Sequence, residues 1–388
     1  MSMKVYMDHG AGKPVDPRVL EVMTPYFMET YGNPASFHGK GFDALKSVNR
    51  ARQQVASLIG AEAAEIVFTS SATEANNLGI GGATRRYKKK GNRIILSAIE
   101  HISSINVGKE LYKEGFEVKY APVNNQGIVE LGELEGLVND KTILVSVMAA
   151  NGEIGTIQPI EKAMEIAHRN GALFHTDATA AAGQIAVNTK SVDFMTISSN
   201  ELYGPKGVGA LYIKKGLRVK PQIIGGGQEN GIRSGSENVP GIVGMGAAAD
   251  FASAEMGAEG KRLSGLRDAL IGGVIETIPE SYLNGHPSVR LPNNANIRFS
   301  YIEGEALILS LDQLGINVSS GSACTAKTLE PSHVLRAIGL KHEEAHGSLV
   351  YTLGKVNNKA HVNYVIEQMS EVVGRLRAMS PLTPEELR

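Results

Sequence analysis

Short apolar and β-branched runs alternate with longer segments of helical periodicity through the first two-thirds of the chain. We predict strands at residues 65–70, 93–98, 116–123, 142–149, 172–178, 193–199 and 209–215. Helix-length segments, such as Pro159 to Arg169, lie between several of these runs. The alternation predicts an α/β fold in which helices cover both faces of a seven-stranded, mostly parallel sheet. A continuous apolar run such as 142–149 is typical of a strand buried on both sides.

The pattern changes near residue 250. The elements predicted beyond this point are a long helix at about 251–278, strands at 294–300 and 348–354, and a final helix at about 359–379. We therefore expect a smaller α+β domain that the long helix joins to the first. The large domain is expected to comprise residues 12–250, and the small domain residues 1–11 and 251–388.

The composition narrows the classes of function. The chain has 388 residues, 42% of them hydrophobic, a formal net charge of −1 and a pI of about 6.8. This balance predicts no binding of nucleic acid or of an anionic membrane surface, and no apolar run approaches the ~20 residues that cross a bilayer. The N-terminal segment MSMKVYMDHG lacks the apolar core of a signal peptide, and one cysteine cannot form an internal disulfide. We expect a reducing, cytoplasmic setting.

Two predicted strand ends carry candidate binding groups. In FTSSATEANN, residues 68–77, a strand ends in small polar residues and a helix begins near Thr73. Free backbone N–H groups there favour an anion such as a phosphate, although an ordinary helix cap would read the same way. In FHTDATAAAG, residues 174–183, Asp177 ends an apolar strand. It can pair with a protonated ring nitrogen of a cofactor, or cap the turn that follows.

Two loops carry further candidates. GGGQENGIRSGSENVPG, residues 225–241, is a glycine-rich loop in which Arg233 could meet a phosphate or a partner's carboxylate; a plain surface loop is the alternative. In SSGSACTAKTLEPSHVLRAIGL, residues 319–340, Cys324 stands among small polar residues. A thiol on an exposed, mobile loop suits nucleophilic, sulfur-carrying or metal-ligating work, whereas most single cysteines are buried.

Together these segments resemble the cysteine desulfurases of iron–sulfur cluster assembly, which are fold-type-I pyridoxal phosphate enzymes related to the class V aminotransferases. The matching segments extend over nearly the whole chain and include MDHGAGKPVDPRV, FTSSATEANN, NGEIGTIQPI, YGPKGVGALYI, GGGQENGIRSGSENVPGIVG and SSGSACTAKTLEPSHVLRAIGL. So many matches in the same order are far more specific than any one motif. The resemblance implies the fold-type-I transferase fold, a homodimer, and a small scaffold protein that docks near the cysteine loop.

The resemblance also implies roles for individual residues. Ala72 and Thr73 match the phosphate cup and Ser198 a further phosphate contact, while Ser236 matches a Thr that reaches in from the second subunit. His101 matches the histidine that stacks on the pyridine ring, and Asp177 matches the partner of the ring nitrogen. Cys324 matches the cysteine that attacks the sulfur of the substrate.

One turn departs from the family at its central chemical group. In TISSNELYGPKGVGALYI, residues 196–213, Asn200 and Glu201 stand where the family has His-Lys. That lysine forms the imine with the cofactor, and a carboxylate can form none. Lys206, which matches a different lysine of the family, and Lys13 are the two candidate replacements.

Other departures concern the cofactor ring and the substrate. Gly152 replaces an Asn, Ala180 replaces a Gln that bonds the ring hydroxyl, and Val350 replaces the Arg that meets the substrate's carboxylate. Gly12 and Lys13 replace the usual Thr-Thr near the N-terminus. Each lost buried hydrogen bond costs ~1–3 kcal/mol, so we expect pyridoxal phosphate to bind weakly and at most non-covalently.

Two functions follow from these observations. The first is a dimeric platform of iron–sulfur cluster biogenesis that lacks normal desulfurase activity; Cys324 then carries sulfur or supplies one ligand of a cluster shared with a scaffold protein. The alternative is an active desulfurase that converts L-cysteine to L-alanine and leaves a persulfide on Cys324, using an unlinked cofactor or a replacement lysine. A related aminotransferase or selenocysteine lyase would need the same missing lysine.

Overall fold

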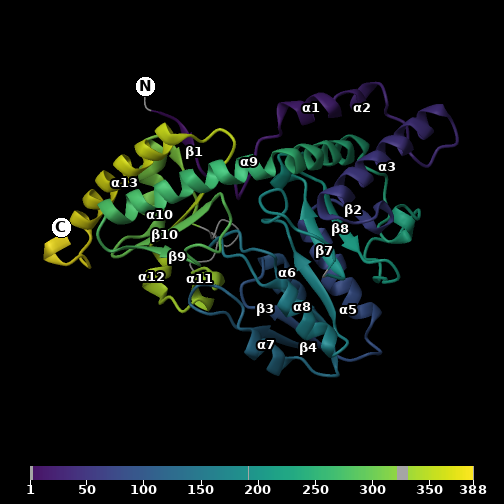
Figure 1. Ribbon diagram of the computed structural model, residues 1–388, viewed down its shortest axis with the longest axis horizontal. Coiled ribbons are helices and arrows are strands. Elements are labelled where there is room, and N and C mark those ends of the chain that lie inside the picture. The colour runs from purple at the N-terminus through teal and green to yellow at the C-terminus, as the bar shows by residue number, and fades with distance from the viewer. Residues whose placement is uncertain (1–2, 191, 321–330, 388) are drawn as a thin grey trace.

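The computed structural model describes residues 3–190, 192–320 and 331–387. Within these ranges a large sheet covered by helices lies beside a smaller sheet, and one long helix passes along both (Figure 1). No helix in these ranges is both long and apolar enough to cross a membrane.

The large sheet has the strand order β2-β8-β7-β6-β5-β3-β4 in the described part of the chain. Its strands are β2 (Ile66–Thr69), β3 (Arg93–Ser97), β4 (Glu117–Ala121), β5 (Thr142–Ser146), β6 (Leu173–Asp177), β7 (Phe194–Ser198) and β8 (Gly209–Ile213). The strands from β4 across to β7 are parallel, and β8 runs antiparallel to both β7 and β2. The predicted α/β fold with a mostly parallel seven-stranded sheet is therefore confirmed.

Both faces of this sheet are buried. On β3, Ile95 belongs to one apolar cluster while Ile94 and Leu96 belong to another. Since successive side chains of a strand point to opposite faces, the two clusters are the cores above and below the sheet. The helices of this part are α1 (Pro17–Met23), α2 (Pro25–Met28), α3 (Gly39–Ile59), α4 (Ala72–Asn76), α5 (Ala83–Arg86), α6 (Ile102–Lys113), α7 (Leu131–Leu137) and α8 (Ile160–Arg169).

Several short helical turns complete this part of the chain. They are the 3₁₀ turns η1 (Ala63–Glu65), η3 (Asn200–Leu202) and η4 (Glu229–Gly231), and the π-helical turn η2 (Asn77–Gly82), which continues α4 into α5. The turn η3 follows β7 directly, so the predicted strand–turn–strand segment at 196–213 is present.

The smaller sheet is antiparallel with the order β12-β10-β9. Its strands are β9 (Ser281–Asn284), β10 (Asn294–Phe299) and β12 (Ser348–Thr352), and β1 (Val5–Tyr6) pairs in parallel with β11 (Ile316–Asn317) nearby. Its helices are α10 (Gly304–Gln313), α11 (His333–Ala337), α12 (His342–His346) and α13 (Lys359–Met379), with a last 3₁₀ turn η5 (Glu385–Leu387). A third apolar cluster holds these elements together. The domain boundaries given above remain a prediction.

The long helix α9 (Val239–Thr277) begins twelve residues before the predicted start at 251. Glycine has a low helix propensity, so the glycines near the start of α9 weaken the helical signal in the sequence. Gly246 is needed there because a Cβ atom would lie 2.6 Å from Ala51 Cα of α3. The first half of α9 packs in the core of the large sheet and the second half in that of the small sheet. The helix thus fixes one sheet relative to the other.

Candidate functional site

A cavity of about 630 Å³ is lined by residues that follow strands β3, β5, β6 and β7. Open α/β sheets place their ligands at this edge. Five of the predicted cofactor residues line it: Ala72, Thr73, His101, Asp177 and Ser198. Ser236 is exposed and does not line it; its predicted role involves a second subunit and stays a prediction. Cys324 lies outside the described residues, so its predicted roles are untested.

Asp177 is fixed at the end of β6. Its side chain is buried, with Oδ2 accepting a hydrogen bond from Asn76 Nδ2 at 2.7 Å and Oδ1 one from Thr179 N at 2.9 Å. The second bond is the capping interaction proposed as the alternative reading of the sequence. Because the carboxylate also borders the cavity, capping does not prevent it from meeting a ligand.

His101 is joined to Asp177 by a hydrogen-bonded chain. Asn76 Nδ2 also donates to Ser103 Oγ at 3.0 Å, and Ser103 Oγ lies 2.7 Å from His101 Nδ1. That nitrogen also accepts a hydrogen bond from Ser103 N at 3.2 Å, so two contacts with Ser103 orient the ring. Asn76 lies in the segment FTSSATEANN and Ser103 two residues after His101, but neither residue was singled out in the sequence, because their contacts with Asp177 and His101 form only in the fold.

The predicted anion side is built on the turn before α4. Ser71 caps this helix by accepting from Glu74 N at 3.2 Å, and Ala72, Thr73 and Ser198 border the cavity beside it. Glu74 forms an ion pair with Arg233 at 2.9 Å. The guanidinium of Arg233 thus bonds a carboxylate of its own chain, and the suggestion that it also meets a phosphate or a partner's carboxylate stays a prediction.

The turn η3 carries the main departure. The Glu201 side chain borders the cavity, and Lys13 Nζ lies 2.9 Å from its Oε2 and 2.7 Å from its backbone carbonyl oxygen. The Lys13 side chain is fully buried, and its Nζ lies 5.2 Å from the centre of the Tyr203 ring. Lys206 Nζ is 3.5 Å from the carbonyl oxygen of Lys13. Neither lysine lines the cavity.

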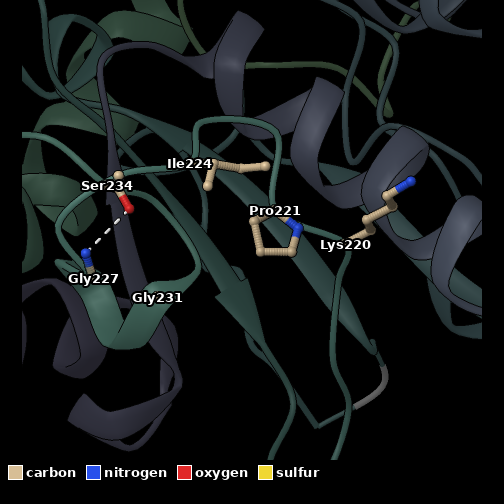
Figure 2. Close-up of a pocket in the computed structure, with 7 residues that line it drawn as sticks. Lys220, Pro221, Ile224, Gly227, Gly231 and Ser234 are labelled. Atoms are coloured by element: carbon tan, nitrogen blue, oxygen red, sulfur yellow. Dashed lines mark hydrogen bonds between the residues drawn. The ribbon is translucent and has the colours of Figure 1, made fainter.

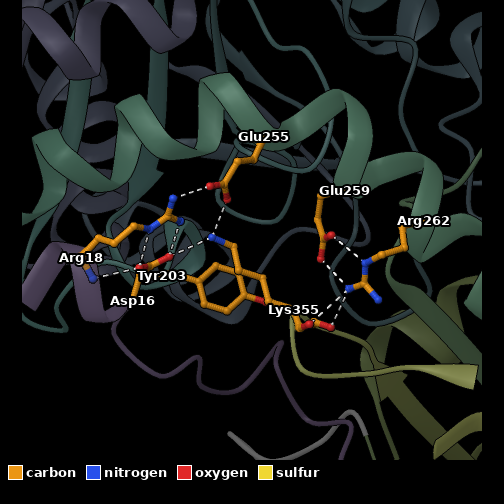
Figure 3. A network of polar contacts seen from close by, with 8 residues as sticks. Asp16, Arg18, Tyr203, Glu255, Glu259, Arg262 and Lys355 are labelled. Atoms are coloured by element: carbon orange, nitrogen blue, oxygen red, sulfur yellow. Dashed lines mark hydrogen bonds and ion pairs between the residues drawn. The ribbon is translucent and has the colours of Figure 1, made fainter. Parts of the chain in front are cut away.

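Beside this turn, a network of ion pairs joins the start of α1 and helix α9 to the loop after β12 (Figure 3). Lys355 Nζ bonds Asp16 Oδ2 at 2.9 Å and Glu255 Oε2 at 2.7 Å. Arg18 bridges the same two carboxylates, at 2.7 and 2.6 Å. Tyr203, whose backbone is left-handed with φ of 61°, accepts at Oη the backbone N–H of Lys355 at 2.9 Å. The turn is therefore tied to both sheets.

Three of the other predicted departures, Gly152, Ala180 and Val350, line the cavity. A Cβ atom at Gly152 would stand 3.4 Å from Ala180 Cβ, so the two positions predicted to lack a ring-hydroxyl partner are neighbours. Val350, at the position of the substrate-binding arginine, also borders the cavity. Within the part of the chain that the structure describes, no lysine or arginine lines this cavity.

Two glutamates on the wall are held in a neutral form near pH 7. Burial, together with the nearby charge of Asp177, raises the pKa of Glu100 to about 8. Burial likewise raises the pKa of Glu153 to about 8. Glu153 Oε2 accepts from Ser332 Oγ at 2.8 Å, whereas its buried Oε1 has no hydrogen-bond partner among the described residues.

The glycine-rich loop encloses a separate hollow of about 280 Å³ (Figure 2). Ser234 Oγ accepts from Gly227 N at 3.3 Å across the loop, and Ile224 is 88% exposed. Lys220 is the one charged residue among those that line the hollow in the described chain. None of the predicted cofactor residues contributes to it.

Comparison with known proteins agrees with this geometry. The family model of the class-V aminotransferases matches residues 5–363. The chain is 54% identical over 379 residues to cysteine desulfurase IscS 1 of Archaeoglobus fulgidus, which covers 97% of this chain and 99% of that protein. It is 48% identical over 386 residues to cysteine desulfurase IscS of Methanosarcina thermophila, covering 99% of this chain and 95% of that protein.

Solved structures of similar proteins share the fold of this chain. A NifS-like protein superposes with a TM-score of 0.91 at 39% identity and covers 96% of this chain and all of its own. The apo structure of a cysteine desulfurase from Thermococcus onnurineus has a TM-score of 0.85 and covers 96% of this chain and 95% of its own; at 24% identity it supports the fold alone. The chain therefore belongs to the class-V aminotransferase family and, within it, to the cysteine desulfurases.

Proposed function

We propose that this protein is a dimeric platform of iron–sulfur cluster biogenesis, in which Cys324 carries sulfur or ligates a cluster while no amine at position 201 holds a cofactor. The observation that carries the proposal is the Glu201 side chain, which borders the cavity and is ion-paired to Lys13. A carboxylate cannot condense with an aldehyde. Normal desulfurase activity would then be absent.

The fit of pyridoxal phosphate differs between the two sides of the cavity. Asp177 and His101 suit its ring, and the Ser71–Thr73 turn with Ser198 suits its phosphate. When bound, the group would supply an aldehyde and an electron-withdrawing ring. The aldehyde side does not fit, because its nearest side chain in the family pattern is Glu201. We therefore derive no reaction step through this cofactor.

The two lysines considered as replacements give no support for a covalent link. Lys13 Nζ is held by both the carboxylate and the carbonyl oxygen of Glu201, and Lys206 is exposed outside the cavity. Freeing Lys13 would leave the Glu201 carboxylate without its partner in a poorly hydrated site. This cost opposes the transfer of Lys13 to an aldehyde.

The proposed assembly is a homodimer that docks a cluster scaffold protein. Large apolar side chains gather on the first three helices and their connections, where Phe27 is 59%, Met28 71% and Phe37 94% exposed. Such a surface is typical of a protein–protein contact and supports dimerisation. One thiolate cannot hold a cluster alone, so Cys324 would supply one ligand and the scaffold protein the others. A cytoplasmic location is part of the same proposal.

A second candidate is an active, pyridoxal phosphate-dependent cysteine desulfurase. The names of the relatives at 45–54% identity favour this candidate over the first, since all are called cysteine desulfurases. It would move the sulfur atom of L-cysteine to Cys324 and release L-alanine. Against it stands the carboxylate of Glu201, which the chain offers where the reaction needs an amine.

Anaerobic co-purification with the scaffold protein of the same organism tests the platform proposal. We expect a complex with the visible absorption of an iron–sulfur cluster, which Cys324→Ala weakens or abolishes. Ser319→Ala, a change in the same segment that removes no thiol, is the control. A cluster that Cys324→Ala leaves unchanged contradicts the ligand role. Sulfide release from L-cysteine by the purified protein would instead establish the second candidate.

A further inference from the structure

The carboxylate at position 201 indicates a class of ligand. We propose that the cavity selects a phosphorylated pyridine that carries a primary ammonium group on its C4 substituent, as in pyridoxamine phosphate, over the aldehyde form of the same ring. Glu201 is the residue that would recognise the ammonium group. The inference rests on the proposed function, because it requires that no lysine of the chain binds the ring covalently.

The contacts of Glu201 leave part of its carboxylate available. Lys13 Nζ lies 2.9 Å from Oε2. Oε1 has a contact with Asn200 Nδ2 at 3.4 Å, which is long for a hydrogen bond. The Lys13 side chain is fully buried and absent from the cavity wall, whereas the Glu201 side chain is 12% exposed and borders the cavity. Since Lys13 is buried and absent from the wall while Glu201 lines the cavity, the acceptor capacity that Lys13 leaves unused is available to a ligand there.

Charge favours an ammonium group at this end of the cavity. A hydrogen bond between an ammonium and a carboxylate is roughly twice as strong as one between neutral groups. An aldehyde oxygen facing the same carboxylate would place two acceptors together, so the site disfavours the wrong ligand as well. No lysine or arginine on the described wall would repel the ammonium group. Lys13 lies behind Glu201 and reduces the attraction without cancelling the hydrogen bond.

The remaining contacts do not distinguish between the ligand forms. Asp177 and His101 would meet the ring nitrogen and ring face, which the aldehyde, amine and alcohol forms share. Gly152 and Ala180 offer no side-chain hydrogen bond to the ring hydroxyl of any form. Any difference in affinity among the three therefore reports on the group at C4 and its neighbour Glu201.

Calorimetric titration of the purified dimer with pyridoxamine phosphate, pyridoxine phosphate and pyridoxal phosphate tests the proposal. We expect the amine to bind roughly tenfold or more tightly than the alcohol, and the aldehyde to bind most weakly. The double variant Lys13→Met/Glu201→Gln removes both buried charges together and should abolish the preference. Glu161→Gln, an exposed carboxylate of α8 outside the cavity, should preserve it.

The possible results separate this inference from the proposed function. Equal affinities for the three forms, or no binding of any form, would overturn the ligand assignment and leave the platform proposal standing. Tight binding of the aldehyde, with borohydride fixing it to Lys13 or Lys206 in a peptide map, would overturn both. A preference for the amine that survives in Lys13→Met/Glu201→Gln would show that Glu201 is not its source and would overturn the assignment as well.

Discussion

The residues that line the cavity form two groups, which differ in the kinds of side chain that they contain. On the ring and phosphate side, Asp177, Asn76, Ser103 and His101 form one hydrogen-bonded chain. A second group of lining residues, Glu201, Gly152, Ala180 and Val350, holds a carboxylate and small or apolar side chains at positions where the sequence predicts departures from the family. The first group has the features of a binding site, while the second group, as far as the structure describes the wall, contains no amine.

The replaced groups are physically coupled. Lys13 stands beside Glu201, and position 152 adjoins position 180. A lysine at position 201 would face Lys13 in a buried setting, where two like charges are costly. The Lys13 ammonium and the Glu201 carboxylate are thus complementary, and changing one of them alters the environment of the other.

The largest expected effect comes from placing the family's residues, Thr and Lys, at positions 13 and 201. We predict that Lys13→Thr/Glu201→Lys gains a covalent adduct with pyridoxal phosphate, because the retained Asp177 side would then face an amine. Borohydride reduction and peptide mapping should find the adduct at position 201 in near-stoichiometric yield. The single variant Lys13→Thr is the control and should gain none. A double variant that folds but forms no adduct would contradict the view that the ring side is intact.

The next largest effect is on the stability of the folded protein, through the ion pair of Lys13 and Glu201. Lys13→Met leaves Glu201 without its partner, and we expect the free energy of unfolding to fall by roughly 3–5 kcal/mol. Lys13→Met/Glu201→Gln should recover most of this loss, because the uncompensated charge is gone. Urea denaturation of the parent, of the single variants Lys13→Met and Glu201→Gln, and of the double variant measures the coupling. Additive losses in the double variant would show that the pair is not a unit.

The third effect is on the pH dependence of the free energy of unfolding. The folded-state pKa of Glu153 is about 8, raised by burial from an ordinary value near 4.5. Its contribution to stability is complete below about pH 4.5 and is lost as pH rises toward 8, because the unfolded chain then releases the proton more readily. We expect Glu153→Gln to be more stable than the parent above pH 8, by roughly 2–4 kcal/mol, and less dependent on pH.

Thermal unfolding between pH 4 and 9 measures this difference. Glu161→Gln, on the exposed surface of α8, is the matched control and should keep the pH profile of the parent. An unchanged profile in Glu153→Gln would mean that this carboxyl group is charged in the folded protein.

The smallest effect concerns the network that joins α1 and α9 to the loop after β12. Lys355 is partly exposed and bonds two carboxylates, Asp16 and Glu255, so Lys355→Met should lower stability by about 1 kcal/mol. Salt should weaken the difference, since partly exposed pairs are screened. Denaturation at low and high salt measures both. A loss several times larger would indicate that the turn carrying Glu201 depends on this network.

Most strands of the large sheet were accessible from sequence, because their short, β-branched apolar runs are buried on both faces; β4, at the edge of the sheet, is only partly buried. The start of α9 and the strand β9 were not accessible from sequence. Gly246 weakens the helical signal for the sake of close packing against α3. The four residues of β9, Ser281–Asn284, follow a helix too closely to show a period.

The candidate site, too, has residues that the sequence could identify and a contact that it could not. Asp177 and His101 could be named because they belong to recognisable segments at strand ends. The Lys13–Glu201 contact could not, because it joins positions 188 residues apart, and only folding brings an N-terminal loop beside the turn after β7. The sequence shows Lys13 and Glu201 as separate substitutions but does not show that the two side chains are in contact.

The most direct test of the central claim is the electronic absorption spectrum of the protein after incubation with pyridoxal phosphate and removal of free ligand. Without an amine placed to condense with the aldehyde, we predict no visible band above the protein background. A yellow band that survives gel filtration, together with a pyridoxyl group that borohydride fixes to a lysine of the chain in a peptide map, would contradict the account.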